Sequence, residues 1–452
     1  MQLIASDQQR VIIGLGMTGL SCARFFRRSG IPFAVVDSRD APPGLAAFKA
    51  EFPDVTLHVG GISDDALRGA TELVVSPGVA LEEPAIARAT SNGVAVTGDI
   101  DLFRRQVSAP IVAITGSNGK STVTTLVGEM AQAAGVAVAV GGNIGVPVLD
   151  LLDGPDQELF VLELSSFQLE RTANLAATVA TVLNMSADHM DRYSSMVGYH
   201  QAKHRIFRQC QQVVINRRDP LSRPLVGDDV VRWTFGLDKP DFRGFGVMNE
   251  NGADYLAFEF TPLMPVSDLK MAGSHNVENA LAALALGHAV GLPVDAMLSA
   301  LREFTGLPHR CQFVAEVCGV KFFNDSKGTN AGASIAAMQG LQGAVNRLVL
   351  IAGGQAKGAD LSPLLPAIKA YARGVVVMGE AADDIAALVG DALTVEWAVS
   401  MAQAVAQALM LAEAGDAVLL SPACASFDMF DNYMHRGDEF CRAVMSLSGR
   451  SQ

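Results

Sequence analysis

Short apolar runs that end in glycine or a small polar residue recur along the whole chain, and helical patterns separate most of them. In the clearest case residues 111–114 are apolar, residues 115–122 are polar and glycine-rich, and residues 122–133 carry a helical pattern. Runs of four or five apolar residues between helices are typical of buried parallel strands. The pattern predicts an α/β protein whose parallel sheets are covered by helices on both faces.

The apolar runs form three groups, as expected for a chain of 452 residues. We predict three domains, over residues 1–98, 99–306 and 307–452. Residues 242–260 contain several glycines and show no clear period, so we expect them to be irregular.

Composition narrows the class of protein. Half of the residues are hydrophobic, 18% are charged, and the formal net charge is −13 with no basic run longer than a pair. Nucleic acid is therefore not expected as a partner. The six cysteines are scattered without a CxxC pair, which indicates reduced thiols. No apolar run reaches the roughly 18 residues of a membrane span, and the first residues lack a signal-peptide pattern, so we expect a cytoplasmic protein.

The most informative stretch is TGSNGKST at residues 115–122, between a predicted strand and a predicted helix. Gly116 and Gly119 leave room for backbone N–H groups to surround phosphate oxygens, and Lys120 adds a positive charge. The Ser121 hydroxyl is suited to Mg²⁺. The spacing departs from GxxxxGK[ST], because Ile114 stands in place of the first glycine. In this context the stretch predicts a nucleotide phosphate site.

Three further residues of the middle segment bear on a metal site. Glu163 lies in an apolar strand, where a carboxylate is costly unless it is paired or bound to metal, so we predict a magnesium ligand. His189 follows another strand and is either a site residue or an ordinary loop histidine. Lys203 lies on an amphipathic helical pattern and, taken alone, is expected to be solvated.

The first segment carries a glycine turn, GLGMTG at residues 14–19, with Asp37 about 20 positions later. This spacing is the fingerprint of dinucleotide binding, in which the carboxylate takes a ribose hydroxyl. The turns at residues 76–79 and 141–145 are either ligand contacts at strand ends or plain turns. NAD binding therefore stays open at this point.

Polar clusters also follow predicted strands in the third segment, at residues 324–330, 353–358 and 421–428. Any one of them is an ordinary helix cap more often than a site. Their repetition at strand ends, with lysines in two of them, favours a shared cleft in a second doubly wound sheet.

Together the motifs resemble one family. TGSNGKST at 115–122, the Glu163 strand, DHMDRY at 188–193, GSHNVENALAAL at 273–284, LPHR at 307–310, NDSKGTN at 324–330 and SPACASFD at 421–428 are similar to those of the Mur ligases of bacterial peptidoglycan synthesis. The resemblance spans nearly the whole chain. It implies a Rossmann-like UDP-binding domain, a central P-loop ATPase-like domain and a C-terminal Rossmann-like domain for the amino acid. Within the family, GLGMTGLSC, SPGV, GGNIG and SPACASFD resemble the branch that joins D-glutamate to UDP-N-acetylmuramoyl-L-alanine.

The resemblance implies that ATP phosphorylates the alanyl carboxylate and that D-glutamate attacks the acyl phosphate through a tetrahedral intermediate. It implies a monomer with two Mg²⁺ ions and a carbamate on Lys203, which replaces the solvated interpretation of that lysine. The implied catalytic residues are Lys120, Asn143, His189 and Lys203, and the implied metal ligands are Ser121, Glu163, His189 and Lys203. ATP binding is implied for Gly116, Ser117, Asn118, Gly119, Lys120, Ser121, Thr122, Asn279, Arg310, Asp325 and Lys327. UDP-substrate binding is implied for Leu15, Thr18, Asp37, Ser38, Arg39 and Gly78, and D-glutamate binding for Thr329, Lys357, Ser426 and Phe427.

Three other hypotheses stay in view. A folylpolyglutamate-type ligase shares the P-loop and C-terminal plan but does not need the first glycine turn. A dinucleotide-dependent oxidoreductase uses that turn with Asp37. A nucleotide-sensing regulator gives Glu163 and His189 no task. Phe427 and Tyr433 stand where aliphatic and phenylalanine side chains are usual in the family, which affects the shape of the amino-acid pocket.

Overall fold

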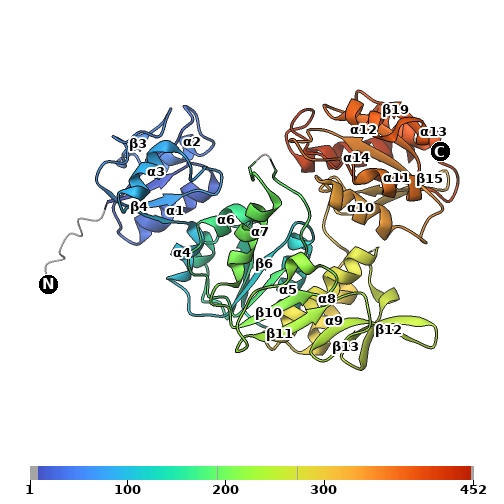
Figure 1. Cartoon of the computed structure of the whole chain (residues 1–452), viewed down its shortest axis with the longest axis horizontal. Helices are drawn as coiled ribbons and strands as arrows, with labels where there is room; N and C mark the ends of the chain where they lie inside the picture. The colour runs from blue at the N-terminus through green and yellow to red at the C-terminus, as the bar shows by residue number, and fades with distance from the viewer. Residues whose placement is uncertain (1–8, 191, 272, 449–452) are drawn as a thin grey trace.

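The computed structural model describes residues 9–190, 192–271 and 273–448 and divides them among three sheets. The sheets lie in three lobes that follow one another along the chain (Figure 1). Most strand pairs are parallel, with helices on the faces, so the predicted α/β fold class is confirmed. The domain bounds themselves remain predictions, and residues 1–8 and 449–452 within them lie outside the described residues.

The first sheet has five strands in the order β3-β2-β1-β4-β5. The strands are β1 (Gln9–Ile13), β2 (Phe33–Val36), β3 (Leu57–His58), β4 (Ala70–Val75) and β5 (Ala95–Thr97), and the helices are α1 (Met17–Arg28), α2 (Leu45–Glu51) and α3 (Pro84–Ser91). The chain turns from one side of the sheet to the other between β1 and β4. Ligands of open α/β sheets bind at the carboxyl ends of such strands.

The central sheet has nine strands in the order β14-β13-β12-β11-β10-β9-β6-β8-β7. Its strands are β6 (Ile111–Thr115), β7 (Val138–Gly142), β8 (Leu159–Glu163), β9 (Val179–Val182), β10 (Gln212–Asn216), β11 (Val231–Phe235), β12 (Gly244–Glu250), β13 (Ala253–Phe258) and β14 (Thr261–Pro265). The helices are α4 (Asp99–Arg104), α5 (Lys120–Ala133), α6 (Ser166–Glu170), α7 (Met196–His204), α8 (Ser274–Ala289) and α9 (Val294–Glu303), with short 3-10 helices η1 (Asp150–Asp153), η2 (Arg205–Phe207), η3 (Pro220–Ser222) and η4 (Val266–Asp268).

The expectation that residues 242–260 are irregular is wrong. They form the antiparallel hairpin β12–β13, in which Glu250 pairs with Ala253. Asn251 and Gly252 connect the strands with φ of 53° and 84°. Two positive φ values suit the tight turn for which Asn-Gly is the preferred pair, so the sequence held a hairpin signal that the glycines obscured.

The third sheet has six strands in the order β15-β16-β20-β17-β18-β19. Its strands are β15 (Gln312–Val317), β16 (Val320–Asn324), β17 (Leu348–Gly353), β18 (Ala372–Met378), β19 (Thr394–Trp397) and β20 (Ala417–Leu420). The helices are α10 (Ala331–Gly340), α11 (Leu364–Tyr371), α12 (Ala382–Val389), α13 (Met401–Leu411) and α14 (Tyr433–Ser448), with η5 (Gly390–Ala392). Helix α10 packs against α8 of the central lobe.

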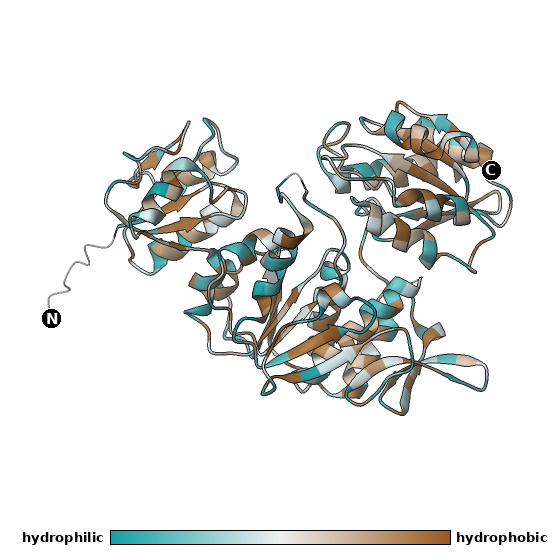
Figure 2. Ribbon diagram, in the orientation of Figure 1, coloured by the Kyte–Doolittle hydropathy of each residue, from teal (hydrophilic) through white to brown (hydrophobic). Residues whose placement is uncertain are grey.

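Apolar residues concentrate on the strands and on the inner helix faces (Figure 2). All five residues of β6 and all five of β8 are buried, which explains why these strands are apolar up to their last residues, Thr115 and Glu163. In the described part of the chain no helix is long and apolar enough to cross a membrane.

Phe322 tests the core of the third lobe because its side chain is fully buried in a cluster with Val349 and Phe440. We expect Phe322→Ala to lower the free energy of unfolding of this domain by about 3–5 kcal/mol, through lost burial and a residual cavity. Phe242→Ala is the control, since Phe242 is 72% exposed and its loss should cost less than about 0.5 kcal/mol. Calorimetry that resolves the domain transitions measures both, and equal shifts for the two variants would contradict the packing.

Candidate active site

The stretch between β6 and α5 forms a loop with the geometry of a phosphate cradle. Gly116 and Gly119 have φ of 154° and 81°. A Cβ on Gly119 would lie 2.4 Å from Oδ1 of Asn279, so a side chain is excluded there by both conformation and space. Lys120 Nζ donates to the carbonyls of Gly116 and Ser117 at 2.8 and 3.0 Å. Burial lowers the pKa of Lys120, while Glu163 and Asp188 oppose the shift.

Glu163 ends β8 beside this loop and is almost fully buried. Its Oε1 accepts a hydrogen bond from Asn143 Nδ2 at 2.7 Å. Its Oε2 is buried and has no hydrogen-bond partner in the structure. A buried carboxylate oxygen without a partner is costly in a protein interior, and a cation would remove that cost.

Lys203 lies on α7 and is only 2% exposed, so the expectation of a solvated lysine is wrong. Its Nζ donates to the Gly116 carbonyl at 2.8 Å and to Thr115 Oγ1 at 3.3 Å, and lies 4.8 Å from the centroid of the Tyr199 ring. Burial, and then the charge of Lys120, lower the pKa of Lys203 well below its ordinary value. The amine is therefore biased toward its neutral form.

His189 has a left-handed backbone, with φ of 57°, and its ring packs edge-on against Phe167 at 4.9 Å. Its side chain is 41% exposed. Asp191, which belongs to the same sequence motif, lies outside the described residues.

One cavity of about 230 Å³ brings these groups together. From the central lobe it is lined by Lys120, Ser121, Asn143, Glu163, His189 and Lys203, and from the third lobe by Arg310, Lys327 and Thr329. Arg310 Nη2 donates to Ser121 Oγ at 2.7 Å across this boundary. All four predicted metal ligands thus share one cavity. Among the described residues no group of three or more His, Cys, Asp and Glu side chains is placed to hold a metal ion alone.

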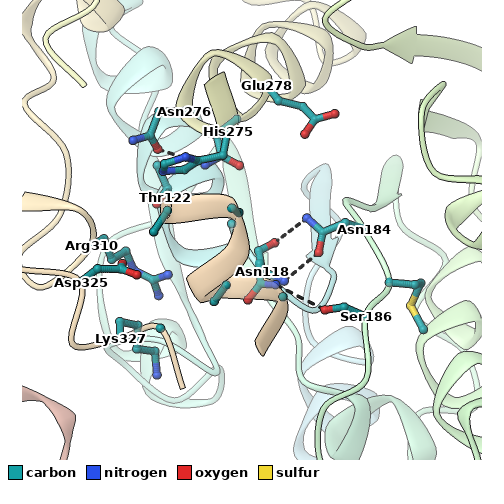
Figure 3. A pocket seen from close by; sticks show the side chains of 18 residues that line it. Asn118, Thr122, Asn184, Ser186, His275, Asn276, Glu278, Arg310, Asp325 and Lys327 are labelled. Carbon is teal, nitrogen blue, oxygen red and sulfur yellow. Dashed lines mark hydrogen bonds between the residues drawn. The ribbon is translucent and has the colours of Figure 1, made fainter. Parts of the chain in front are cut away.

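A neighbouring cavity of about 280 Å³ is lined by the predicted nucleotide residues Thr122, Asn279 and Asp325, and it shares Asn118, Gly119, Arg310 and Lys327 with the first cavity. Figure 3 shows Arg310, Asp325 and Lys327 on one side of it and Asn184 and Ser186 on the other. Asn118 links the loop to the second side, since its N–H donates to Asn184 Oδ1 at 2.8 Å.

Burial shifts the pKa values of two charged groups that the third lobe contributes to the cleft. The pKa of Lys327 is lowered to about 8, first by burial and then by Arg310 and Lys120. Burial raises the pKa of Asp325 to about 7, although Asp325 accepts hydrogen bonds from Ser421 Oγ at 2.6 Å and from the Cys311 N–H at 3.1 Å. Lys120, Arg310 and Lys327 line these two cavities, so the cleft is a suitable environment for a polyanion.

A separate cavity of about 530 Å³ lies at the carboxyl ends of β1 and β4. The predicted residues that line it are Thr18, Asp37, Ser38, Arg39 and Gly78. Burial tends to raise the pKa of Asp37, but Arg39 and the N–H groups of Leu15 and Arg39 outweigh it and hold the value at about 2. Asn143 lines this cavity as well as the one with Glu163, so it lies between the two.

The structure places Leu15 differently from the other predicted residues of this cavity. Its side chain is fully buried in the core, and only its N–H, which donates to Asp37 Oδ2 at 2.6 Å, faces the site. Met17, which we did not predict, lines the cavity and is 76% exposed. The sequence signal that could have indicated this contact is the position of Met17, an apolar residue at the start of the helix that follows the glycine turn.

The predicted amino-acid residues are divided between two places. Thr329 lines the cavity with Lys203. Lys357 and Phe427 meet on the loops after β17 and β20, with Lys357 Nζ 5.1 Å from the Phe427 ring centroid. Ser426, which directly precedes Phe427, is buried. The structure also shows Lys327 Nζ 4.0 Å from the ring centroid of Tyr433.

Arg436 was missed by sequence reasoning, because nothing in the pattern of α14 marks it. It is buried and donates to the carbonyls of Ser326 and Cys424 at 2.8 and 3.1 Å. It therefore joins the two loops that precede Lys327 and Ser426.

Three protein-family models match successive parts of this sequence. Residues 8–98 match the N-terminal domain of MurD-like Mur ligases, residues 114–287 the Mur ligase middle domain, and residues 309–424 the glutamate ligase domain of Mur ligases.

Curated relatives match over the full chain. A UDP-N-acetylmuramoylalanine–D-glutamate ligase of Pseudomonas savastanoi pv. phaseolicola is 58% identical over 99% of this chain and 100% of its own length. The ligase of the same name from Pseudomonas aeruginosa is 56% identical over the same shares. A solved UDP-N-acetylmuramate–alanine ligase of Thermotoga maritima covers 97% of this chain and 99% of its own at 19% identity with a TM-score of 0.61, a likeness of fold.

Proposed function

Because this chain belongs to the Mur ligase family, we propose that it joins D-glutamate to UDP-N-acetylmuramoyl-L-alanine with the hydrolysis of ATP to ADP and phosphate, the activity named for its Pseudomonas relatives. The observation that carries the proposal is the cavity where Lys120, Glu163 and Lys203 face Lys327 and Thr329 across two lobes. In this cavity ATP held by the residues of the central lobe would meet the amine of D-glutamate held by the residues of the third lobe.

The reaction begins with transfer of the γ-phosphoryl group of ATP to the alanyl carboxylate, which forms an acyl phosphate and ADP. The D-glutamate amine then attacks the carbonyl carbon, loses a proton and expels phosphate from the tetrahedral intermediate. No side-chain nucleophile is needed, so the residues act by positioning and charge. In this proposal Lys120 exchanges its two loop carbonyls for the ATP phosphates. Asn143 Nδ2, which donates to Glu163 Oε1 in the structure, donates to the reacting carboxylate.

The residues fit a magnesium requirement. Glu163 has a buried oxygen without a partner, and Ser121 follows Lys120 in the first turn of α5. A set of one carboxylate and one hydroxyl, completed by phosphate oxygens and water, is typical of Mg²⁺ at nucleotide sites. When bound, Mg²⁺ supplies the positive charge that lets the phosphates and the carboxylate approach each other. A second ion would be held by His189 and Lys203.

For Lys203 this role requires a carbamate, since an ammonium group does not bind a cation. The neutral amine attacks CO₂ and loses a proton, which gives an N–COO⁻ group. The buried position of Lys203, beside the Gly116 carbonyl and facing the cavity, supports this modification because burial favours the neutral amine.

For the UDP end, we propose the cavity at β1 and β4, with Thr18, Asp37, Ser38, Arg39 and Gly78 around uracil, ribose and diphosphate and Met17 against the base. The glycine turn then serves UDP, as the MurD-like match over residues 8–98 supports, rather than NAD. The D-glutamate carboxylates are assigned to Lys357, Ser426 and Thr329, with Phe427 beside Lys357. The protein acts as a cytoplasmic monomer in this proposal.

Asp37 offers a direct test of the UDP assignment. We expect Asp37→Asn to weaken UDP binding about tenfold in calorimetric titration, because a charged hydrogen-bond acceptor is lost in a buried position. Asp54→Asn is the control, since Asp54 is 66% exposed and pairs with Arg27 outside the cavity. Equal affinity in the Asp37 variant would remove Asp37 from the UDP site.

The activity is tested by a panel of amino acids in a phosphate-release assay with ATP, Mg²⁺ and UDP-N-acetylmuramoyl-L-alanine. We expect phosphate release with D-glutamate and background release with L-glutamate, L-lysine or meso-diaminopimelate. Release with another amino acid would place the chain elsewhere in the family. Release with dihydrofolate analogues and L-glutamate, or quenching of NADH fluorescence, would favour the folylpolyglutamate-type or the dinucleotide alternative.

A further inference from the structure

Asn330 is a buried side chain that connects the third lobe to the central lobe. It is the N-cap of α10, and its Oδ1 accepts a hydrogen bond from the Ala333 N–H at 2.8 Å. Its Nδ2 donates to Asn118 Oδ1 at 3.3 Å and to Asp188 Oδ2 at 3.2 Å. Only 5% of the residue is exposed. One amide thus caps a helix with one end and binds two segments of another domain with the other.

The cap determines which end of the amide points across the boundary. Only the oxygen can accept from the Ala333 N–H, so the NH₂ group must face Asn118 and Asp188. The first turn of α10 approaches the central lobe closely at the same place, since a Cβ on Gly332 would lie 2.8 Å from Ser186 Oγ. Ser186 in turn accepts from Asn118 Nδ2 at 3.4 Å.

The segments that meet at Asn330 belong to three different tasks of the proposed reaction. Asn118 lies in the phosphate loop, and Asp188 directly precedes His189. Thr329, assigned to the amino acid, directly precedes Asn330 and lines the cavity with Lys203. The hydrogen bonds of Asn330 therefore determine how far the amino-acid loop lies from the phosphate loop.

We infer that Asn330 is a positioning residue, whose amide holds the amino-acid loop of the third lobe against the phosphate loop in the arrangement that acyl transfer requires. The inference rests on the proposed ligase function. The attacking amine must come within about 3–3.5 Å of the acyl carbon, and an error of about 1 Å costs on the order of 10²-fold in rate. Asn330 lines the cavity with Lys203 and Thr329, but its hydrogen bonds go to Ala333, Asn118 and Asp188, so its role is exerted through the two loops.

Asn330→Asp separates the two roles of the side chain. Aspartate is as good an N-cap as asparagine, so the bond to Ala333 is kept, but both donors to the central lobe are lost and a carboxylate faces Asp188. Asn330→Ala loses the cap as well. Ser400→Ala is the matched control, because Ser400 caps α13 by accepting from the Gln403 N–H and lies in the same domain.

In the ligation assay we expect Asn330→Asp to reduce kcat at least about tenfold and to raise the KM for D-glutamate, as loop misplacement predicts. Its melting temperature should fall no further than that of Asn330→Ala, since the cap is kept. The dissociation constant of a fluorescent ATP analogue should change less than about threefold, because the phosphate loop keeps its other hydrogen bonds, such as the one from the Asn118 N–H to Asn184 Oδ1, although Asn330 lines the cavity with Lys120 and Lys203. Ser400→Ala should lower the melting temperature and leave kcat unchanged.

A kcat within twofold of wild type for Asn330→Asp would overturn the inference, and so would a loss of activity that merely follows melting temperature in all three variants. Failure of the proposed function is seen separately, as wild-type protein that releases no phosphate with D-glutamate. In that case small-angle scattering tests the structural part of the inference, that the Asn330 amide holds the third lobe against the central lobe: a larger radius of gyration for Asn330→Asp than for wild type supports it, and equal values overturn it.

Discussion

Lys120→Ala is expected to reduce kcat/KM for the ATP-dependent ligation by at least about a thousandfold. The ammonium is the only charge that the phosphate loop itself carries, and it lies on the Gly116 and Ser117 carbonyls at the mouth of the loop. The removal of one preorganised charge or donor at a reacting oxyanion costs on the order of 10²–10³ in rate, and loss of phosphate binding adds to this. ADP release under saturating D-glutamate measures the effect.

The control for this change is Lys369→Ala, on the exposed face of α11. It should leave kcat/KM unchanged. Lys120→Arg keeps the charge but not the compact shape of the ammonium, so we expect only partial recovery. Substantial activity in Lys120→Ala would mean that the loop does not hold the transferred phosphoryl group.

Lys203→Ala is expected to lose most activity and to regain part of it when acetate is added. The substitution leaves a vacated volume beside Thr115 and Gly116 in the cavity that Glu163 and His189 also line. A small carboxylate has the oxygens that the carbamate would supply, so acetate can occupy that volume. Rates measured against acetate concentration, with chloride at the same ionic strength as the reference, give the recovery.

Lys203→Arg separates charge from modification, because a guanidinium keeps the positive charge and cannot be carbamylated under these conditions. We expect it to be as inactive as the alanine variant and insensitive to acetate. Full activity in either variant would remove Lys203 from the site. Wild-type activity that falls when CO₂ is removed and returns with bicarbonate would support the carbamate independently.

The candidate site was found from sequence where chemistry and local structure coincide. The conformation of residues 115–122 can be predicted from the sequence, because glycine is the residue that readily takes the positive φ values found at Gly116 and Gly119. The helix that follows is predicted from its own sequence pattern. Glu163 was selected because a carboxylate in an apolar strand has few explanations, and the structure places its Oε2 without a partner. The errors concern residues whose environment comes from elsewhere in the chain, such as Leu15, whose side chain packs in the core while Met17 lines the cavity.

By itself the sequence determined the α/β class, the order of the strands and helices around the phosphate loop, and the family. These depend on periodicity, glycine conformation and motif order, which are local properties. Tertiary structure alone decided that Lys203 is buried beside Gly116 and that Asn330 joins two domains. A charged or polar residue on an amphipathic pattern is expected to face solvent, because the pattern does not show which distant segment covers it. Gly116, the partner of Lys203, is 87 positions away along the chain, and Asn118, a partner of Asn330, is 212 positions away.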